Sequence, residues 1–238
     1  MKKIIISLAL LAGSATLFTQ CSTTTGTTQS VGFGLQAVQF ALNGGLNNVV
    51  SLFNDPKSFI SNALIEAAIP KELKDINKSL TDVGLGSLVD KEKNMIAGVA
   101  KSTVSTAEPI LKNAINNLTA QDVATIAMGG KGAATKILRE KTETQLVQAL
   151  TPVVSKQVSQ LGLNNVLNNA LLGEKGKAIT SILGAVAGLK TTGDVSQNID
   201  KYVTQQLTDG IYKVIEDSEA KTRSNPTNIL NGILGGQN

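Results

Sequence analysis

Cys21 carries the only thiol in this chain of 238 residues, so the chemistry open to it is narrow. No second cysteine is present that could form a disulfide with it. Its neighbours Gln20 and Ser22 are uncharged, so no histidine or charged side chain lies next to the thiol to make it a catalytic nucleophile. Attachment of a lipid to the sulfur is the remaining chemistry, and the residues in front of Cys21 favour it.

The residues before Cys21 have the order of a secretory signal. Lys2 and Lys3 form a positive segment, and residues 4–18 form an apolar segment of 15 residues. At about 1.5 Å per residue this segment spans roughly 22 Å, less than the ~30 Å hydrocarbon core of a bilayer. A cleaved signal therefore fits better than a transmembrane helix.

A cysteine directly after such a segment, followed by a soft polar run, resembles the export signal of a bacterial lipoprotein. In such proteins the cysteine becomes the first residue and carries lipid. We therefore expect a signal peptide over residues 1–20 and a lipidated Cys21 with a flexible tether over residues 21–30, since residues 22–30 are only Ser, Thr, Gly and Gln. The expected address is the cell envelope, at the outer membrane and facing the periplasm.

The composition excludes several classes of catalyst. The chain has no histidine, so His-dependent triads, His general bases and zinc sites are excluded. It has no tryptophan and only 3% aromatic residues, which argues against a base-stacking surface. Without Lys2 and Lys3 the net charge falls from +4 to +2, too little for binding a polyanion. We predict no catalytic residue, no metal, no cofactor and no nucleic-acid partner.

A glycine-rich loop over residues 129–132 contains Lys131 and precedes a predicted helix. It does not match a P-loop, because Gly132 follows the lysine where Ser or Thr is required. The N–H groups of a helix start can bind an anion, and Lys131 would add a positive charge. The alternative, which we favour, is a turn between helices that uses glycine for its geometry.

The acidic residues Glu216, Asp217 and Glu219 lie close together near the C-terminal end of the chain. A pair of carboxylates can act as general acid and base. Since Lys213 and Lys221 are near them, an exposed helix face is the better interpretation.

The hydrophobic pattern after residue 31 predicts helices nearly throughout and no strand. Two long amphipathic segments, 133–160 and 194–221, each return apolar residues to one stripe. Shorter helices are expected over 33–52, 57–67, 71–82, 90–104, 107–118, 121–127, 163–171 and 177–189. We predict an all-α class with a single multi-helix bundle over residues 31–238.

Three positions carry typical helix-start chemistry. Asp55 precedes Pro56, Thr119 is followed at the third position by Asp122, and Asp194 follows a glycine. Segment 173–192 is unusual, because its residues 178–189 are almost continuously apolar and contain a GxxxG pattern. These twelve residues are too few to span a bilayer, so a buried helix is favoured over a membrane-embedded or dimerising element.

Short stretches along the chain also carry a family resemblance. They include residues 69–73, 119–123, 129–135, 200–204 and 223–226. In order and spacing they resemble the bacterial domain-of-unknown-function family 4197, over residues 37–235. Its members are exported proteins, often with lipoprotein-type signals. The resemblance implies an all-α exported domain and no particular reaction.

The resemblance also directs attention to the helix that follows residues 129–132. Thr135, Arg139 and Thr142 are four and three residues apart and fall on one side of that helix. Lys131 and Lys141 could flank the same side. If the family keeps a polar or anion-binding site, it should be here. Alternatively, Arg139 pins the helix-end carbonyls of a neighbouring helix.

Three functions remain open. The first is a lipid-anchored, non-enzymatic protein that binds an apolar, lipid-like ligand or an envelope protein partner. The second is a structural or assembly factor of the envelope, which predicts a large exposed apolar patch. The third, least favoured, is a hydrolase-type enzyme that does without histidine.

Overall fold

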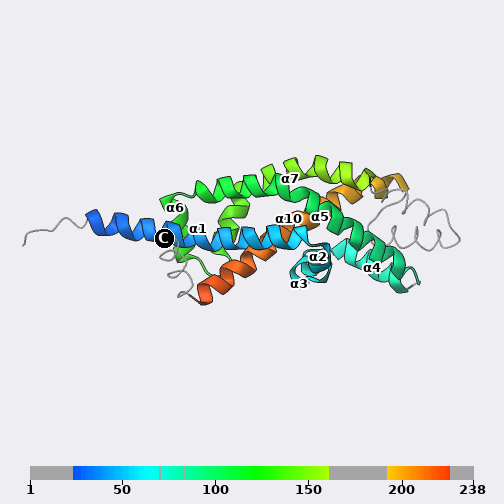
Figure 1. Ribbon diagram of the computed structural model, residues 1–238, viewed down its shortest axis with the longest axis horizontal. Helices are drawn as coiled ribbons and strands as arrows, with labels where there is room; N and C mark the ends of the chain where they lie inside the picture. Colours follow the sequence, from blue (N-terminus) through cyan, green and yellow to red (C-terminus); the bar gives the residue numbers. More distant parts are fainter. Residues whose placement is uncertain (1–23, 70, 83, 161–191, 226–238) are drawn as a thin grey trace, which may run out of the picture.

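A computed structural model describes residues 24–69, 71–82, 84–160 and 192–225 (Figure 1). These residues form eight helices and no strand, which confirms the all-α class. The four long helices are α1 (Thr24–Asn54), α5 (Gly86–Asn116), α7 (Ala133–Gln160) and α10 (Thr192–Ser224). The short helices are α2 (Pro56–Ser61), α3 (Ala63–Ala68), α4 (Lys71–Asp82) and α6 (Ala120–Met128).

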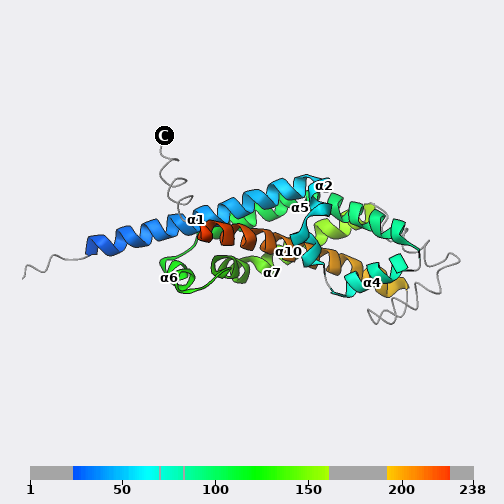
Figure 2. The same ribbon diagram turned by 90° about the horizontal axis from the view of Figure 1, so that it is seen from below.

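The four long helices close into a ring, because each packs against two others. α1 contacts α5 and α10, and α7 contacts the same two helices. Neighbours in the ring run in opposite directions (Figures 1 and 2), as in an up-down-up-down four-helix bundle. α2, α3 and α4 lie towards one end, and α6 joins α5 to α7 at the other (Figure 1). The predicted single multi-helix bundle is confirmed.

The core lies inside this ring and follows the three-to-four-residue spacing of one helix face. Its fully buried apolar side chains include Leu42, Phe53, Leu111, Ile115, Leu138, Leu146, Leu150, Val154, Leu207, Ile211 and Ile215. The buried residues of α7 and α10 in this list belong to the two apolar stripes that were predicted for segments 133–160 and 194–221. Packing of such stripes supplies most of the stability of a helical bundle.

Two of the predicted helix starts are confirmed. Asp55 caps α2 by accepting from the backbone N–H of Lys57, and Pro56 is the first residue of the helix. Thr119 and Asp122 form a reciprocal capping box at the start of α6. Each motif satisfies backbone N–H groups that have no partner inside the helix.

α1 begins earlier in the sequence than the helix predicted over 33–52. It starts at Thr24, so residues 24–30, where a flexible tether was predicted, are helical. Ser, Thr and Gly are poor helix formers, but adding residues to an existing helix costs far less than starting one. No proline interrupts this stretch, so the packed part of α1 can extend towards the N-terminus.

Three other predicted boundaries differ from the structure. α10 begins at Thr192, so Asp194 lies inside the helix and is not its cap. α5 is continuous over residues 105–106, where a break between two helices was expected, and it also continues through Pro109. Proline removes one backbone hydrogen bond, and the buried neighbours Ala107 and Leu111 hold the helix together. The helix predicted over 57–67 is divided at Asn62, whose side chain accepts from two N–H groups of α3.

The signal peptide, Cys21 and the predicted helices 163–171 and 177–189 lie outside the described residues, as does nearly all of segment 173–192. Among the residues that the structure describes, no helix combines the length and apolar character needed to cross a membrane.

Candidate functional site

The N-terminus of α7 is capped by a carboxylate from α10. Glu219 is 1% exposed. Its Oε1 accepts from the N–H of Ala134 at 3.0 Å, and its Oε2 accepts from the N–H and hydroxyl of Thr135 at 2.8 Å each. A negative charge is favourable at a helix start. An anion position therefore exists where the glycine-rich loop enters α7, but the chain's own carboxylate fills it.

Gly132 makes this arrangement possible, because its φ of 80° lies in the left-handed region. A Cβ at this position would be 3.0 Å from Oε1 of Glu216, so α10 also approaches the turn closely. The favoured interpretation of residues 129–132, a turn that needs glycine for geometry, agrees with the structure.

Arg223 extends the same contact to a third helix. Its Nε donates to Oε1 of Glu219 at 2.7 Å, and its Nη2 donates to the carbonyl of Ile126 near the end of α6 at 3.2 Å. One carboxylate and one guanidinium thus join the end of α6, the start of α7 and the last turns of α10. Pinning helix-end carbonyls was the alternative role considered for Arg139, and the structure assigns it to Arg223.

The prediction that Glu219 belongs to an exposed acidic face is wrong. Ser218 and Glu219 are buried, while Glu216 is exposed and Asp217 forms a surface ion pair with Lys221. Glu219 follows Leu207, Ile211 and Ile215 at intervals of four residues. Its position on the buried face was the signal that could have identified it.

Arg139 and Thr142 lie on the same side of α7, as their spacing predicted, and this side faces α10. The Nη2 of Arg139 lies 2.6 Å from both Glu143 Oε1 and Asp209 Oδ1, and its Cζ lies 5.0 Å from the ring centre of Tyr212. The hydrogen bond to Glu143 raises the pKa of Arg139, and Asp209 raises it further. The guanidinium therefore remains charged.

Thr142 is buried and closes the inner side of this cluster. Its hydroxyl is 2.6 Å from the carbonyl of Leu138 and 2.8 Å from the hydroxyl of Tyr212. Burial raises the pKa of Tyr212 to about 12, so its hydroxyl stays protonated. The pair is a neutral hydrogen-bonded contact between α7 and α10.

The two lysines of the predicted cluster do not join it. Lys141 pairs with Asp122 of the α6 capping box, at 3.0 Å between Nζ and Oδ2. Lys131 is exposed in the loop, and no partner for its ammonium is found among the described residues. Thr135, Arg139 and Thr142 therefore face α10 together, whereas Lys141 points to α6 and Lys131 to solvent.

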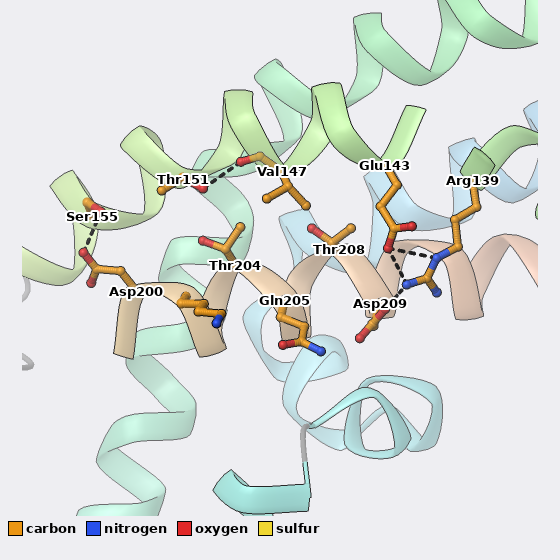
Figure 3. Close-up of a pocket in the computed structure, with 11 residues that line it drawn as sticks. Arg139, Glu143, Val147, Thr151, Ser155, Asp200, Thr204, Gln205, Thr208 and Asp209 are labelled. Atoms are coloured by element: carbon orange, nitrogen blue, oxygen red, sulfur yellow. Dashed lines mark hydrogen bonds and ion pairs between the residues drawn. The ribbon is translucent and has the colours of Figure 1, made fainter. Parts of the chain in front are cut away.

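Next to this cluster, α7 and α10 border a groove of about 460 Å³, which we call the α7–α10 groove. It is bounded near one end by the Arg139–Asp209 contact and near the other by Ser155, whose hydroxyl donates to Asp200 at 2.5 Å (Figure 3). Between these contacts it is lined by Glu143, Val147, Thr151, Lys201, Thr204, Gln205 and Thr208.

Two threonines of the groove lack hydrogen-bond partners. A threonine in a helix can donate to the carbonyl four residues back, as Thr151 does to Val147 at 2.7 Å. Thr204 and Thr208 extend from α10 towards α7 (Figure 3), each is 2% exposed, and neither buried hydroxyl oxygen has a partner. Buried polar groups without partners are rare in folded proteins. They identify the middle of the groove as a place where hydrogen-bonding capacity is unused.

The α7–α10 groove also offers a charge. Arg139 is engaged by Glu143 and Asp209, but the exposed Lys201 has no ion-pair partner within the part of the chain that the structure describes. Gln205 is exposed beside it. The described residues contain no group of three or more histidine, cysteine, aspartate or glutamate side chains that could hold a metal ion.

The fold and the polar contacts between α7 and α10 define an all-α bundle with a partly polar groove, the α7–α10 groove. The chain matches the family described as protein of unknown function (DUF4197) over residues 28–235, and it belongs to that family. Comparison with curated proteins and with solved structures gave no match. The expected family is therefore confirmed, with its limits slightly wider than predicted.

Proposed function

We propose that this protein is a lipid-anchored bacterial envelope protein that binds a protein partner without catalysis, and that the α7–α10 groove receives the partner. The unused hydroxyls of Thr204 and Thr208 carry the proposal. A polypeptide segment in the groove would offer N–H and C=O groups to them and an acidic side chain to Lys201.

The anchor rests on the residue order around Cys21. Cys21 stands three positions before the first residue of α1, and the first turns of α1 extend beyond the α6 end of the bundle (Figures 1 and 2). Lipid on Cys21 would therefore attach the bundle to the membrane, in our proposal the outer membrane on its periplasmic side, by this end. The α7–α10 groove lies farther along the bundle, where a partner can reach it.

The lining of the groove favours a protein over a lipid-like molecule. Threonine hydroxyls, the Gln205 amide and charged side chains surround Val147, the apolar side chain of the lining. An acyl chain would bury these polar groups without giving them hydrogen bonds, which is costly. A polypeptide segment can satisfy them.

No specific observation among the described side chains supports either of the two alternative functions, an assembly factor or an enzyme. An assembly factor predicts a large apolar patch, but among the described side chains the exposed large apolar residues are only two, Phe40 on α1 and Met128 at the end of α6. For an enzyme, an acid with a strongly shifted pKa is required. Glu92 has a raised pKa, but it borders, together with Glu66, a cavity of only about 20 Å³. That volume suits about one water molecule and no substrate.

Site-specific photocrosslinking in cells tests the proposal. A benzophenone residue replaces Thr151, which lines the groove, and in a matched strain it replaces Lys101, an exposed residue of α5 outside the groove. We expect a light-dependent protein adduct from position 151 and none from position 101, and we expect Lys201→Glu to reduce the yield several-fold.

Equal adducts at both positions would contradict the groove as the binding site. Absence of a protein adduct, together with co-purified lipid in native mass spectra, would replace the protein partner with the lipid-like ligand.

A further inference from the structure

A second polar feature lies where α3, α4, α5 and α10 meet, away from the α7–α10 groove. A cavity of about 20 Å³ is bordered there by Glu66, Asn77, Glu92, Lys93 and Gln206, among apolar neighbours. A space of this size can hold about one water molecule.

Two oxygens at this cavity have no hydrogen-bond partner. They are Oε2 of Glu92 and Oε1 of Gln206, and both are excluded from solvent. Gln206 is 3% exposed; Glu92 is only partly buried as a whole residue, but its Oε2 is not accessible. An amide oxygen and an ionised carboxylate both only accept hydrogen bonds. With Glu92 ionised, neither oxygen can satisfy the other.

Protonation of Glu92 can supply the hydrogen bond that each of these two oxygens lacks. The neutral carboxyl group is a donor, and the Gln206 amide oxygen that borders the same cavity is an acceptor, so one shared proton would serve both oxygens. Burial raises the pKa of Glu92 from 4.5 to about 7. The Asn77 side chain and Lys93 oppose this increase, and Glu66 adds to it.

The polar side chains around Glu92 come from four helices: Glu66 from α3, Asn77 from α4, Lys93 from α5 and Gln206 from α10. α2 also borders the cavity, but only with the apolar Phe59 and Ile60. Lys93 is engaged with Glu66 at 3.7 Å. Its charge is therefore already partly balanced.

α4 is the element most easily released at this junction, because its helix contacts are mainly with α5. A groove of about 470 Å³ runs along α4 and shares Glu66, Asn77 and Lys93 with the cavity. Water can approach Glu92 from this groove if α4 moves outward.

We infer that this junction is a proton-controlled contact: it is closed while Glu92 is neutral, and ionisation of Glu92 draws water into the cavity and loosens α4 from α5. The inference is independent of the α7–α10 groove and of what binds there. It gives the protein a response to pH at the end of the bundle opposite α6.

Hydrogen exchange of the α4 amides tests the inference. Ionisation is easier in the open state, so protection should fall as the pH rises from about 4.5 and level off near 7. Between about pH 5 and about pH 7.5 we expect a roughly 50-fold loss of protection, after correction for intrinsic exchange. Glu92→Gln should abolish this dependence, whereas Asp90→Asn, at an exposed position of α5, should retain it.

A carbon-13 NMR titration of the Glu92 carboxyl in the unaltered protein supplies a readout that needs no variant. The expected midpoint is about 7. A midpoint near 4.5, or a pH-dependent loss of α4 protection that persists unchanged in Glu92→Gln, would overturn the inference.

Discussion

Glu219 places a carboxylate against two backbone N–H groups, one hydroxyl and one guanidinium while staying 1% exposed. Burial of a charge is unfavourable unless hydrogen bonds and an opposite charge compensate it. Here both compensations come from Ala134, Thr135 and Arg223. Removing the carboxylate would leave two N–H groups of α7 without partners and Arg223 without its counter-ion.

We predict that Glu219→Ala lowers the free energy of unfolding by about 3 kcal/mol. Glu216→Ala, three residues earlier on the exposed side of the same helix, should change it by less than about 0.5 kcal/mol. Urea unfolding of both variants measures the difference. Equal effects would mean that the carboxylate does not hold α7.

Sequence reasoning placed Thr135, Arg139 and Thr142 on one side of a helix but missed their partners. Spacing within α7 determines which of its residues share a face. It contains no information on which residues of α10 lie opposite, because that depends on how the two helices pack. Glu219 was missed for a different reason: charged residues are rarely buried, so its four-residue spacing from Ile215 was outweighed by its charge.

At the scale of helices, the close approach of α1 and α10 at Gly45 depends on the absence of a side chain there. A Cβ at Gly45 would lie 2.9 Å from the Cα of Ile215, a backbone atom that cannot move by itself. At Gly44 the nearest atom would be the Ser218 hydroxyl oxygen at 3.8 Å, which is an ordinary contact. Two neighbouring glycines in α1 thus have opposite roles.

Gly45→Ala should lower the free energy of unfolding by about 1–3 kcal/mol, because α1 and α10 must separate. Gly44→Ala should raise it by about 0.5–1 kcal/mol, because alanine favours the helix and meets no obstacle. Thermal unfolding of the two variants side by side is the measurement. A stabilised Gly45→Ala would show that the two helices are farther apart.

Helix limits were predictable where local chemistry specifies them. α4 and α7 have the predicted bounds, and the caps at Asp55 and Thr119 were identified correctly. The errors occur where packing outweighs local preference: α5 is one helix where two were predicted, and α1 starts inside a Ser/Thr/Gly-rich stretch. The α7–α10 groove could not be predicted at all, since it arises between two helices rather than within one.

At the scale of the whole molecule, Glu92 should make stability depend on pH. Its folded-state pKa of about 7 exceeds the ordinary value of 4.5, so the neutral form is favoured by folding. This stabilisation is complete below pH 4.5 and is lost as the pH rises to about 7, by about 3 kcal/mol. Glu92→Gln does not titrate. The free energy of unfolding of Glu92→Gln minus that of the unaltered protein should therefore increase between pH 4.5 and about 7 and stay constant at higher pH. Urea titrations at a series of pH values measure this difference. A difference that is the same at every pH would contradict the prediction.

Membrane attachment concerns the whole molecule as well, and Cys21 decides it. A single acyl chain holds a protein only marginally, with a binding constant on the order of 10⁴ M⁻¹, whereas several chains hold it firmly. We predict that the unaltered protein remains in the membrane fraction after a high-salt wash. Cys21→Ser should move it to the soluble fraction, while Ser22→Ala, which keeps the thiol, should not. The wash separates a lipid anchor from attraction by surface charges, which salt screens.

A Cys21→Ser variant that stayed with the membranes after washing would contradict the lipid anchor. The bundle itself would then have to provide the attachment. The α6 end, from which α1 extends, would no longer be the expected point of contact with the membrane (Figure 1).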